Sequence, residues 1–379
     1  MLNVIAPAHR QAVPIHRVAR APNGHGPAAQ ARNRPARVGL GLGILMVGLM
    51  LGGGTPARAA EPSACPVRQP ADLATLDRVH QVEEFRLFYT LRGPHALHHT
   101  QDADGNGVPD GVEDAARQLI AARRLFVEAI GLAHPLQQPR YRARAQGIDV
   151  HLLAIGPAYA ASHGRAYDEV RQYAHGAGAS TARCALRIDL DTRWRPPNQT
   201  PAHELFHLFQ NGYTPFKVAW FTEGTARWAE SALGPGTDTA NTLPATPAAL
   251  SALWASSYQA GAFWNRLTRL LDPAGEMPPV PDTLQAMRYT DGRPVLEDTR
   301  LHGAAFMKAL LEALAQAGDR VSRHNGWQPF DWRESDQKSH QHDAELWAVV
   351  IEVVKRFPID TPELARLAAL SAGPRPPGT

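Results

Sequence analysis

The stretch that organises this sequence is HELFH at residues 203–207, followed by WFTEGTA at residues 220–226. On a helix, residues four apart lie on one face, so His203 and His207 can direct two imidazole nitrogens at one point. Glu204 lies next to that face and can reach a water molecule on a metal ion held there. The spacing predicts a metal-binding helix with Glu204 as its catalytic residue. The alternative is a coincidental pair of histidines on an ordinary helix.

A third ligand can come from Glu223, sixteen residues after His207. The intervening segment 211–215 contains turn-forming residues, so a second helix starting near Thr222 would bring Glu223 back to the first. Catalytic zinc usually takes three protein ligands, and two histidines with one glutamate form a known set. We therefore predict a catalytic Zn²⁺ site on His203, His207 and Glu223. A simpler alternative is that the dipole of the second helix favours Glu223 in its first turn.

The two motifs resemble the gluzincin metallopeptidases, the group of thermolysin and aminopeptidase N, in which the downstream glutamate is the third zinc ligand. A closer resemblance is to a family of secreted bacterial metalloproteases first noticed in myxobacteria and known mostly by its motifs. Three segments carry this resemblance: the aspartate-rich stretch 102–113, HELFHLFQ at 203–210 and EGTARWAE at 223–230. It covers about residues 83–235 and implies peptidase chemistry without indicating a substrate.

The patterns along the chain predict an α+β, zincin-like fold with a small mixed or antiparallel sheet, an active-site helix and a mostly helical C-terminal lobe. Strand patterns occur at residues 83–91, 147–155 and 184–191, and helical patterns at 248–271, 301–317 and 343–357. Residues 160–182 are rich in Ala, Gly, His and Tyr and indicate an irregular loop. The strand at 184–191 resembles the gluzincin edge strand to which a peptide substrate adds.

The first sixty residues lack the pattern of a folded domain, with seven arginines and no acidic residue. A basic segment precedes fourteen apolar residues, 38–51, and the motif Ala57-Arg58-Ala59, an order typical of a cleaved signal peptide. A membrane span needs about twenty apolar residues. We predict that residues 1–59 are removed and that the protein is exported to the periplasm or the extracellular space, without a stable membrane span. The true translation start can lie downstream of Met1.

The rest of the chain divides into an N-terminal α+β lobe (60–235), a mostly helical C-terminal lobe (236–370) and a disordered tail (371–379). Removing seven arginines from 39 basic residues leaves 32 against 36 acidic residues, a net charge of −4. The basic balance of the whole chain therefore belongs to the leader, and nothing in the mature part indicates binding to nucleic acid. The oligomeric state is left open.

Two cysteines, Cys65 and Cys184, remain after the leader. In an exported protein they favour a disulfide between the N-terminus and the central region. Two separate thiols are the alternative, because sequence gives no distance between them.

The stretch DADGNGVPDGVE at residues 102–113 fits the pattern of a calcium-binding loop. Its side-chain oxygens, the glycine at the sixth position and the backbone carbonyl of the seventh follow the order that wraps Ca²⁺, and a helical pattern follows the loop. We predict a structural Ca²⁺ site with the ligands Asp102, Asp104, Asn106, Val108, Asp110 and Glu113. The alternative is a turn rich in Asp, Asn and Gly that binds no ion.

Three further residues are candidates for supporting roles in catalysis. Glu230 lies seven residues after Glu223 and can orient a ligand histidine; a surface salt bridge with Arg227 is an equal alternative. Tyr258 and His302 are candidate donors to the transition state, although core or surface roles fit them as well.

Together these patterns predict a secreted, zinc-dependent metalloendopeptidase-like hydrolase that acts on peptide or protein substrates, with Glu204 as the general base. One alternative is an exported, non-catalytic binding protein that calcium and zinc stabilise. Another is a zinc hydrolase of an amide in cell-wall material. An intact Glu204 disfavours the non-catalytic alternative, since a purely structural site does not need it.

Overall fold

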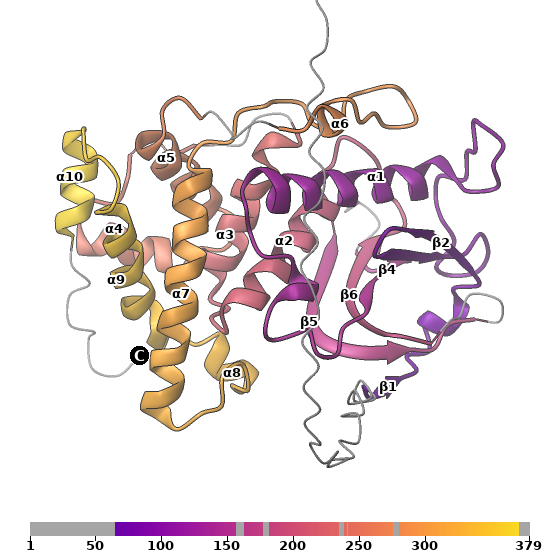
Figure 1. Cartoon of the computed structure of the whole chain (residues 1–379), viewed down its shortest axis with the longest axis horizontal. Coiled ribbons are helices and arrows are strands. Elements are labelled where there is room, and N and C mark those ends of the chain that lie inside the picture. The colour runs from indigo at the N-terminus through magenta and orange to yellow at the C-terminus, as the bar shows by residue number, and fades with distance from the viewer. Residues whose placement is uncertain are drawn as a thin grey trace, which may run out of the picture. The chain divides into compact units, whose positions relative to one another are not determined.

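The computed structural model describes residues 65–156, 163–176, 182–234, 239–240, 242–275 and 280–370 (Figure 1). These residues all belong to one compact unit, Ala59–Thr379. The predicted signal peptide and the predicted tail at 371–379 lie outside the described residues. No helix within the described ranges is both long and apolar enough to cross a membrane.

A mixed sheet of six strands forms one half of the described structure (Figure 1). In spatial order its strands are β1 (Val67–Arg68), β5 (Gly164–Tyr173), β6 (Cys184–Asp191), β4 (Gly147–Leu153), β3 (Phe85–Tyr89) and β2 (Arg78–Val82). Strands β6, β4 and β3 are parallel to one another, β5 is antiparallel to β6, β2 is antiparallel to β3, and β1 is parallel to β5. Strand β1 pairs only with the end of β5, at Gln172 and Tyr173. The first part of β5 is therefore an open edge among the described strands.

Two predictions about this part of the sheet are wrong. Residues 160–182, predicted to form an irregular loop, contain the ten-residue strand β5. Strand β6, predicted to lie at the edge, lies between β5 and β4 and is almost entirely buried. The physical reason is that β5 has partly exposed polar residues on both faces, so it lacks an apolar repeat. The polar residues of β6 are instead buried in ion pairs such as Arg187 with Asp189.

Helices α1 (Asp110–Arg124) and α2 (Thr200–Tyr213) pack on one face of this sheet. That face presents alternate apolar residues of the central strands, including Leu87, Val150 and Ile188, all fully buried in the main core. Alternation with period two is what a strand needs to bury one face. The packing holds α2 beside β5, because the two elements contact each other along their lengths.

Most of the remaining helices form the other half of the structure (Figure 1). They are α3 (Ala219–Ala229), α4 (Pro247–Trp254), α5 (Ala260–Leu271), α6 (Asp282–Gln285), α7 (Ala304–Asn325), α8 (Glu334–Gln337), α9 (Asp343–Val354) and α10 (Pro362–Ala369). The helix predicted at 248–271 is two helices, α4 and α5. Helix α7 contacts α2 and α9, and one core includes side chains from both predicted lobes.

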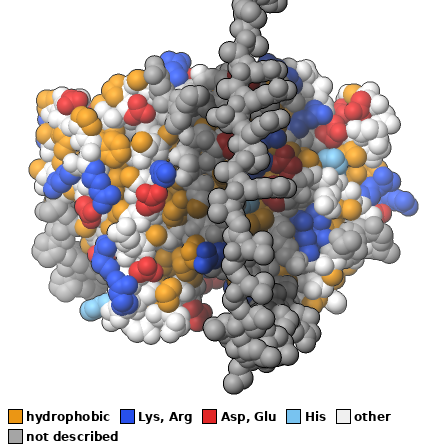
Figure 2. Space-filling model, viewed as in Figure 1, with side chains coloured by type: hydrophobic (Ala, Val, Ile, Leu, Met, Phe, Trp, Pro, Cys, Tyr) orange, Lys and Arg blue, Asp and Glu red, His pale blue; other side chains and the backbone are white. Residues whose placement is uncertain are grey.

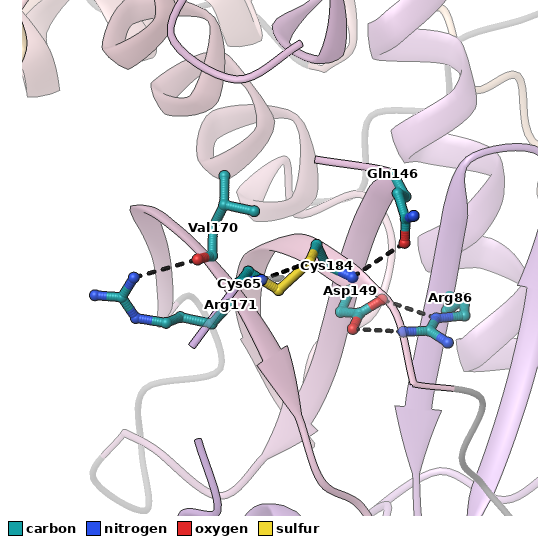
Figure 3. Close-up of a disulfide and its surroundings, with 7 residues drawn as sticks. All are labelled: Cys65, Arg86, Gln146, Asp149, Val170, Arg171 and Cys184. Carbon is teal, nitrogen blue, oxygen red and sulfur yellow. Dashed lines mark hydrogen bonds and ion pairs between the residues drawn. A yellow bond between two sulfur atoms is a disulfide. The ribbon is translucent and has the colours of Figure 1, made fainter. Parts of the chain in front are cut away.

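The predicted disulfide between Cys65 and Cys184 is confirmed, with the two Cα atoms 5.8 Å apart (Figure 3). It fastens the segment before β1 to the first residue of β6. Near it, Arg86 donates two hydrogen bonds to Asp149, at 2.9 and 2.8 Å, on the sheet face opposite α2. On the outer surface in the view of Figure 2, acidic and basic side chains are interspersed among apolar ones.

Candidate metal centre

Three predicted ligands meet at one point between α2 and α3. His203, His207 and Glu223 each offer one ligand atom, and these atoms all lie within 4.8 Å of one another. The Nε2 atoms of both histidines face the same oxygen of Glu223, at 3.1 Å from His203 and 3.5 Å from His207. The four-residue spacing on α2 and the return of the chain through α3 bring them together. The geometry is that of a site that could hold a metal ion.

Two residues fix the orientation of the histidine rings. Nδ1 of His203 lies 2.7 Å from Glu230, and Nδ1 of His207 lies 2.7 Å from the amide oxygen of Gln210. Because Nδ1–H donates to these oxygens, a neutral ring keeps its Nε2 lone pair for a metal ion. Glu230 also accepts a 2.6 Å bond from Arg227. Both roles considered for Glu230 therefore occur together.

The site brings two imidazole nitrogens and a carboxylate oxygen close together, an arrangement that a positive charge between them stabilises. Burial opposes a charge on His203, but hydrogen bonds to Glu223 and Glu230 outweigh it and raise the pKa of His203 to about 10. Against the effect of burial, the two histidines lower the pKa of Glu223 far below its ordinary range. A proton on His203 can serve as the cation, and a divalent metal ion would supply more charge at the same point.

Glu204 lies beside this cluster without belonging to it. Its side chain is buried, and burial raises the pKa of its carboxyl. The two histidines oppose this increase, and the carboxylates of Glu223 and Asp189 add to it. The start of β5 passes directly over it. A Cβ atom on Gly164 would lie 2.5 Å from Oε1 of Glu204, so any larger residue there would force the side chain of Glu204 to move. The edge strand thereby covers the candidate base.

The exposed side of the metal cluster faces a cleft of about 1310 Å³. Glu204, His207 and Glu223 line it together with residues of β5 and of the segment before α8. Tyr258 lines it too, with its ring stacked on His203 at 5.9 Å between centroids. Although Tyr258 is 57% exposed, its partial burial and the carboxylates of Glu223 and Glu204 raise its pKa to about 12, and the hydroxyl is a hydrogen-bond donor.

A smaller cavity of about 310 Å³ lies on the other side of Glu204 and Tyr258. His302, the other candidate donor, lines neither space. Its Nδ1 lies 2.8 Å from the carbonyl oxygen of Asp272, and it lines a different pocket together with Trp228. The structure therefore brings Tyr258, and not His302, to the metal cluster.

The predicted calcium loop is folded, and α1 starts at its end as expected. Asn106 donates from its amide to Asp104 at 3.1 Å and to Glu113 at 2.8 Å. Asp102 accepts from two backbone N–H groups of the loop, and Asp110 accepts from a third. The loop carboxylates are not among the close clusters found in the described residues. Its polar side chains thus point inward, toward backbone donors and one amide.

A second cluster, Asp149, His151 and His175, lies on the opposite sheet face. Nε2 of His151 faces Nε2 of His175 at 3.0 Å, and its Nδ1 faces Asp189 at 3.1 Å. Each carboxylate already forms two hydrogen bonds with an arginine, as Figure 3 shows for Arg86 and Asp149. A divalent cation here would add charge to carboxylates that are already compensated. A buried polar network explains this cluster without a metal ion.

Two features of the site were missed in the sequence. Gln210 is three residues after His207 on the same helix face, a spacing that could have indicated its contact. Its amide orientation is set by bonds from Nε2 to the carbonyl of Thr222 and the hydroxyl of Thr225. The wall formed by β5 had no comparable signal in the sequence.

Models of known protein families, curated proteins and solved structures were all compared with this chain, and none gave a significant match.

Proposed function

We propose that this chain is a secreted zinc-dependent peptidase of the zincin-like type, with Glu204 as its general base. The observation that carries the proposal is the convergence of His203, His207 and Glu223 at one wall of a large cleft, with Glu204 beside them. A structural metal site has no need of a cleft or of a buried carboxylate that is not a ligand.

The donor set favours zinc over other metal ions. Two imidazole nitrogens and one carboxylate form a known set of catalytic zinc ligands, with one position left for the reaction. Calcium and magnesium prefer oxygen ligands alone. The bonds from Glu230 and Gln210 to the Nδ1 atoms match the support that metal-bound histidines usually have.

The chain's own residues would supply the proton transfers. When bound, zinc polarises the scissile carbonyl and lowers the pKa of water at the site. Glu204 would take the proton of the attacking water and deliver it to the leaving nitrogen. Its raised pKa suits a group that must both accept and return a proton. Tyr258 would donate its hydroxyl proton in a hydrogen bond to the oxyanion, because its raised pKa keeps it protonated.

The open edge of β5 offers a place for an extended peptide. Along the cleft, the first part of β5 pairs on this side with no other strand of the described structure, and an added strand would gain hydrogen bonds from its backbone. Gly164 brings this edge against Glu204. A peptide paired with β5 would therefore pass the candidate base.

The direct test is hydrolysis by the purified mature protein. We expect cleavage of denatured proteins and of a diverse peptide mixture, about one zinc per chain by elemental analysis, and loss of cleavage after zinc chelation. Adding zinc back should restore activity, whereas adding magnesium should not. A mature protein that binds no zinc, or that cleaves nothing in a broad mixture, contradicts the proposal and favours a binding protein.

We also propose that the loop 102–113 binds Ca²⁺ as a structural ion. With a dissociation constant of about 0.1–1 mM, 10 mM Ca²⁺ would stabilise the protein by about 1.4–2.7 kcal/mol. For a unit of this size, that corresponds to a rise in melting temperature of roughly 2–4 °C. Asp104→Ala or Glu113→Gln should remove the rise, and Asp319→Asn, at an exposed position on α7, should keep it. Unfolding that is insensitive to millimolar calcium would reduce the loop to a turn.

A further inference from the structure

A cluster of charged residues lies in the cleft away from the metal centre. Arg140, before β4, and Lys217, between α2 and α3, both contact Asp168 on β5. The distances to the same oxygen, Oδ2 of Asp168, are 2.5 Å from Arg140 and 2.6 Å from Lys217. All three residues line the cleft that contains Glu204 and Glu223. Two cations thus share one carboxylate.

The positive charge of Lys217 has fewer favourable partners than that of Arg140. Arg140 also donates to the carbonyl oxygen of Asn211 at 2.7 Å, near the C-terminal end of α2, where the helix dipole favours a positive charge. Its guanidinium lies over the rings of Tyr141 and Phe330. Among the described residues, the only acceptor within hydrogen-bond distance of Lys217 Nζ is Asp168. An ammonium group has three donors, so two remain for a ligand.

Because this cluster is largely buried, water screens its excess positive charge only weakly. The side chains of Arg140 and Lys217 are only 10% and 17% exposed. Burial, and the neighbouring Arg140, lower the pKa of Lys217 against the effect of Asp168. The other charges at this end of the cleft are paired or exposed: Glu334 pairs with Lys338 and Glu169 with Arg171, both at 2.5 Å, and Arg144, Arg165 and Asp331 are exposed. Within the buried cluster, two cations face one carboxylate, so one positive charge is left over.

We propose that Lys217, supported by Arg140, binds a carboxylate group of the peptide substrate. This inference rests on the proposed peptidase function and names the chemistry of the substrate. An incoming carboxylate would supply the second anion that the pair of cations lacks, in a partly buried place where charge-assisted hydrogen bonds are strong. The carboxylate can belong to an aspartate or glutamate side chain or to the free C-terminus of the peptide.

The position of the cluster limits where in the peptide the carboxylate lies. Asn211 is one helical turn beyond His207, about 6 Å along the helix axis. On β5, Asp168 is four residues beyond Gly164, which lies against Glu204. An extended peptide rises about 3.3 Å per residue. The carboxylate should therefore lie about two to four residues from the bond that is cut.

The experiment starts from a neutral peptide that the wild-type protein cleaves, with the cut bond found by mass spectrometry. One series places Glu or Gln at each position from two to four residues on either side of that bond. A second series compares a free C-terminal acid with the amide at the same distances. We expect kcat/KM to be about ten- to a hundredfold higher for the carboxylate member of at least one pair, the range of a charge-assisted hydrogen bond. The series that responds identifies the source of the carboxylate.

Variants then assign the preference to Lys217. In Lys217→Met the ratio of kcat/KM between paired peptides should fall close to one. The matched control is Lys338→Met, because Lys338 lines the same cleft but is paired with Glu334 and exposed; it should keep the ratio. Asp168→Asn removes the shared anion and should raise the ratio. If Lys217→Met does not fold, raising the salt concentration with the wild-type protein must lower the ratio instead.

The possible results separate this inference from the proposed function. Peptide cleavage without any carboxylate preference, or a preference that persists in Lys217→Met, overturns the carboxylate subsite and leaves the peptidase proposal intact. A protein that contains zinc but cleaves no peptide overturns both.

Discussion

Replacing Glu204 by Gln is expected to reduce peptide hydrolysis by about 10²–10⁴-fold, while the zinc content stays the same. Glutamine has nearly the shape of glutamate, so the close contact with Gly164 is preserved. It cannot accept the proton of the attacking water. Because Glu204 is not a ligand, the metal site should form as before. Kinetics on one cleaved peptide and elemental analysis of the same sample would measure both effects.

The control for this variant is Glu312→Gln, an exposed position on α7, which should cleave at the wild-type rate. Glu204→Gln with wild-type activity would exclude Glu204 as the base. Loss of zinc together with activity would instead mean that Glu204 helps to hold the ion. The zinc content distinguishes a loss of the base, in which zinc stays bound, from a loss of the metal itself.

A graded loss of zinc is the second large effect that we expect. His207→Ala removes one of three ligands and should reduce the zinc content from about one per chain to almost none. Glu223→Gln should weaken zinc binding strongly, because a neutral amide is a poorer ligand than a carboxylate. Glu230→Gln keeps all three ligands and should cost about ten- to a hundredfold in zinc affinity, since it weakens the bond that orients His203. Competition with a chromophoric chelator would measure the series.

Arg227→Gln is the matched control for Glu230. Arg227 contacts Glu230, but its side chain is 42% exposed and it has no contact with the histidines in the described structure. We expect zinc affinity close to that of the wild-type protein. An equal loss in Arg227→Gln and Glu230→Gln would show that the ion pair, and not the bond to His203, matters for the metal.

The metal cluster was predictable because its geometry is local. The i and i+4 spacing of His203 and His207 and the turn before α3 almost fix the positions of both histidines and Glu223. The fold of the loop 102–113 is local in the same sense, because its hydrogen bonds join residues within a dozen positions, while its calcium binding stays a prediction. The disulfide was predictable because the only two cysteines of the chain both follow the predicted leader.

The cleft was not predictable, because it is made by residues far apart in the sequence. Asp168, Arg140 and Lys217 meet only through the sheet order that leaves the first part of β5 without a neighbouring strand on one side. A strand at the rim of a cleft exposes part of both faces, so its residues have no simple alternation. In contrast, β6 has a clear alternation although it is internal, because its polar face is buried in ion pairs. The prediction that β6 is the edge rested on its position before α2 and on the gluzincin resemblance, and neither determines the order of strands in the sheet.

The exposed edge of β5 also bears on how copies of this protein behave in solution. An open strand edge attracts the edges of other molecules and promotes aggregation. Two features of this chain counteract such pairing. The disulfide holds β1 against the far end of β5, which shortens the open part. The remaining part has charged residues at Arg165, Asp168, Glu169 and Arg171, and pairing with a second folded copy would remove water from these charged side chains, which costs free energy. The edge can thus stay open to a single flexible chain while resisting a second folded copy.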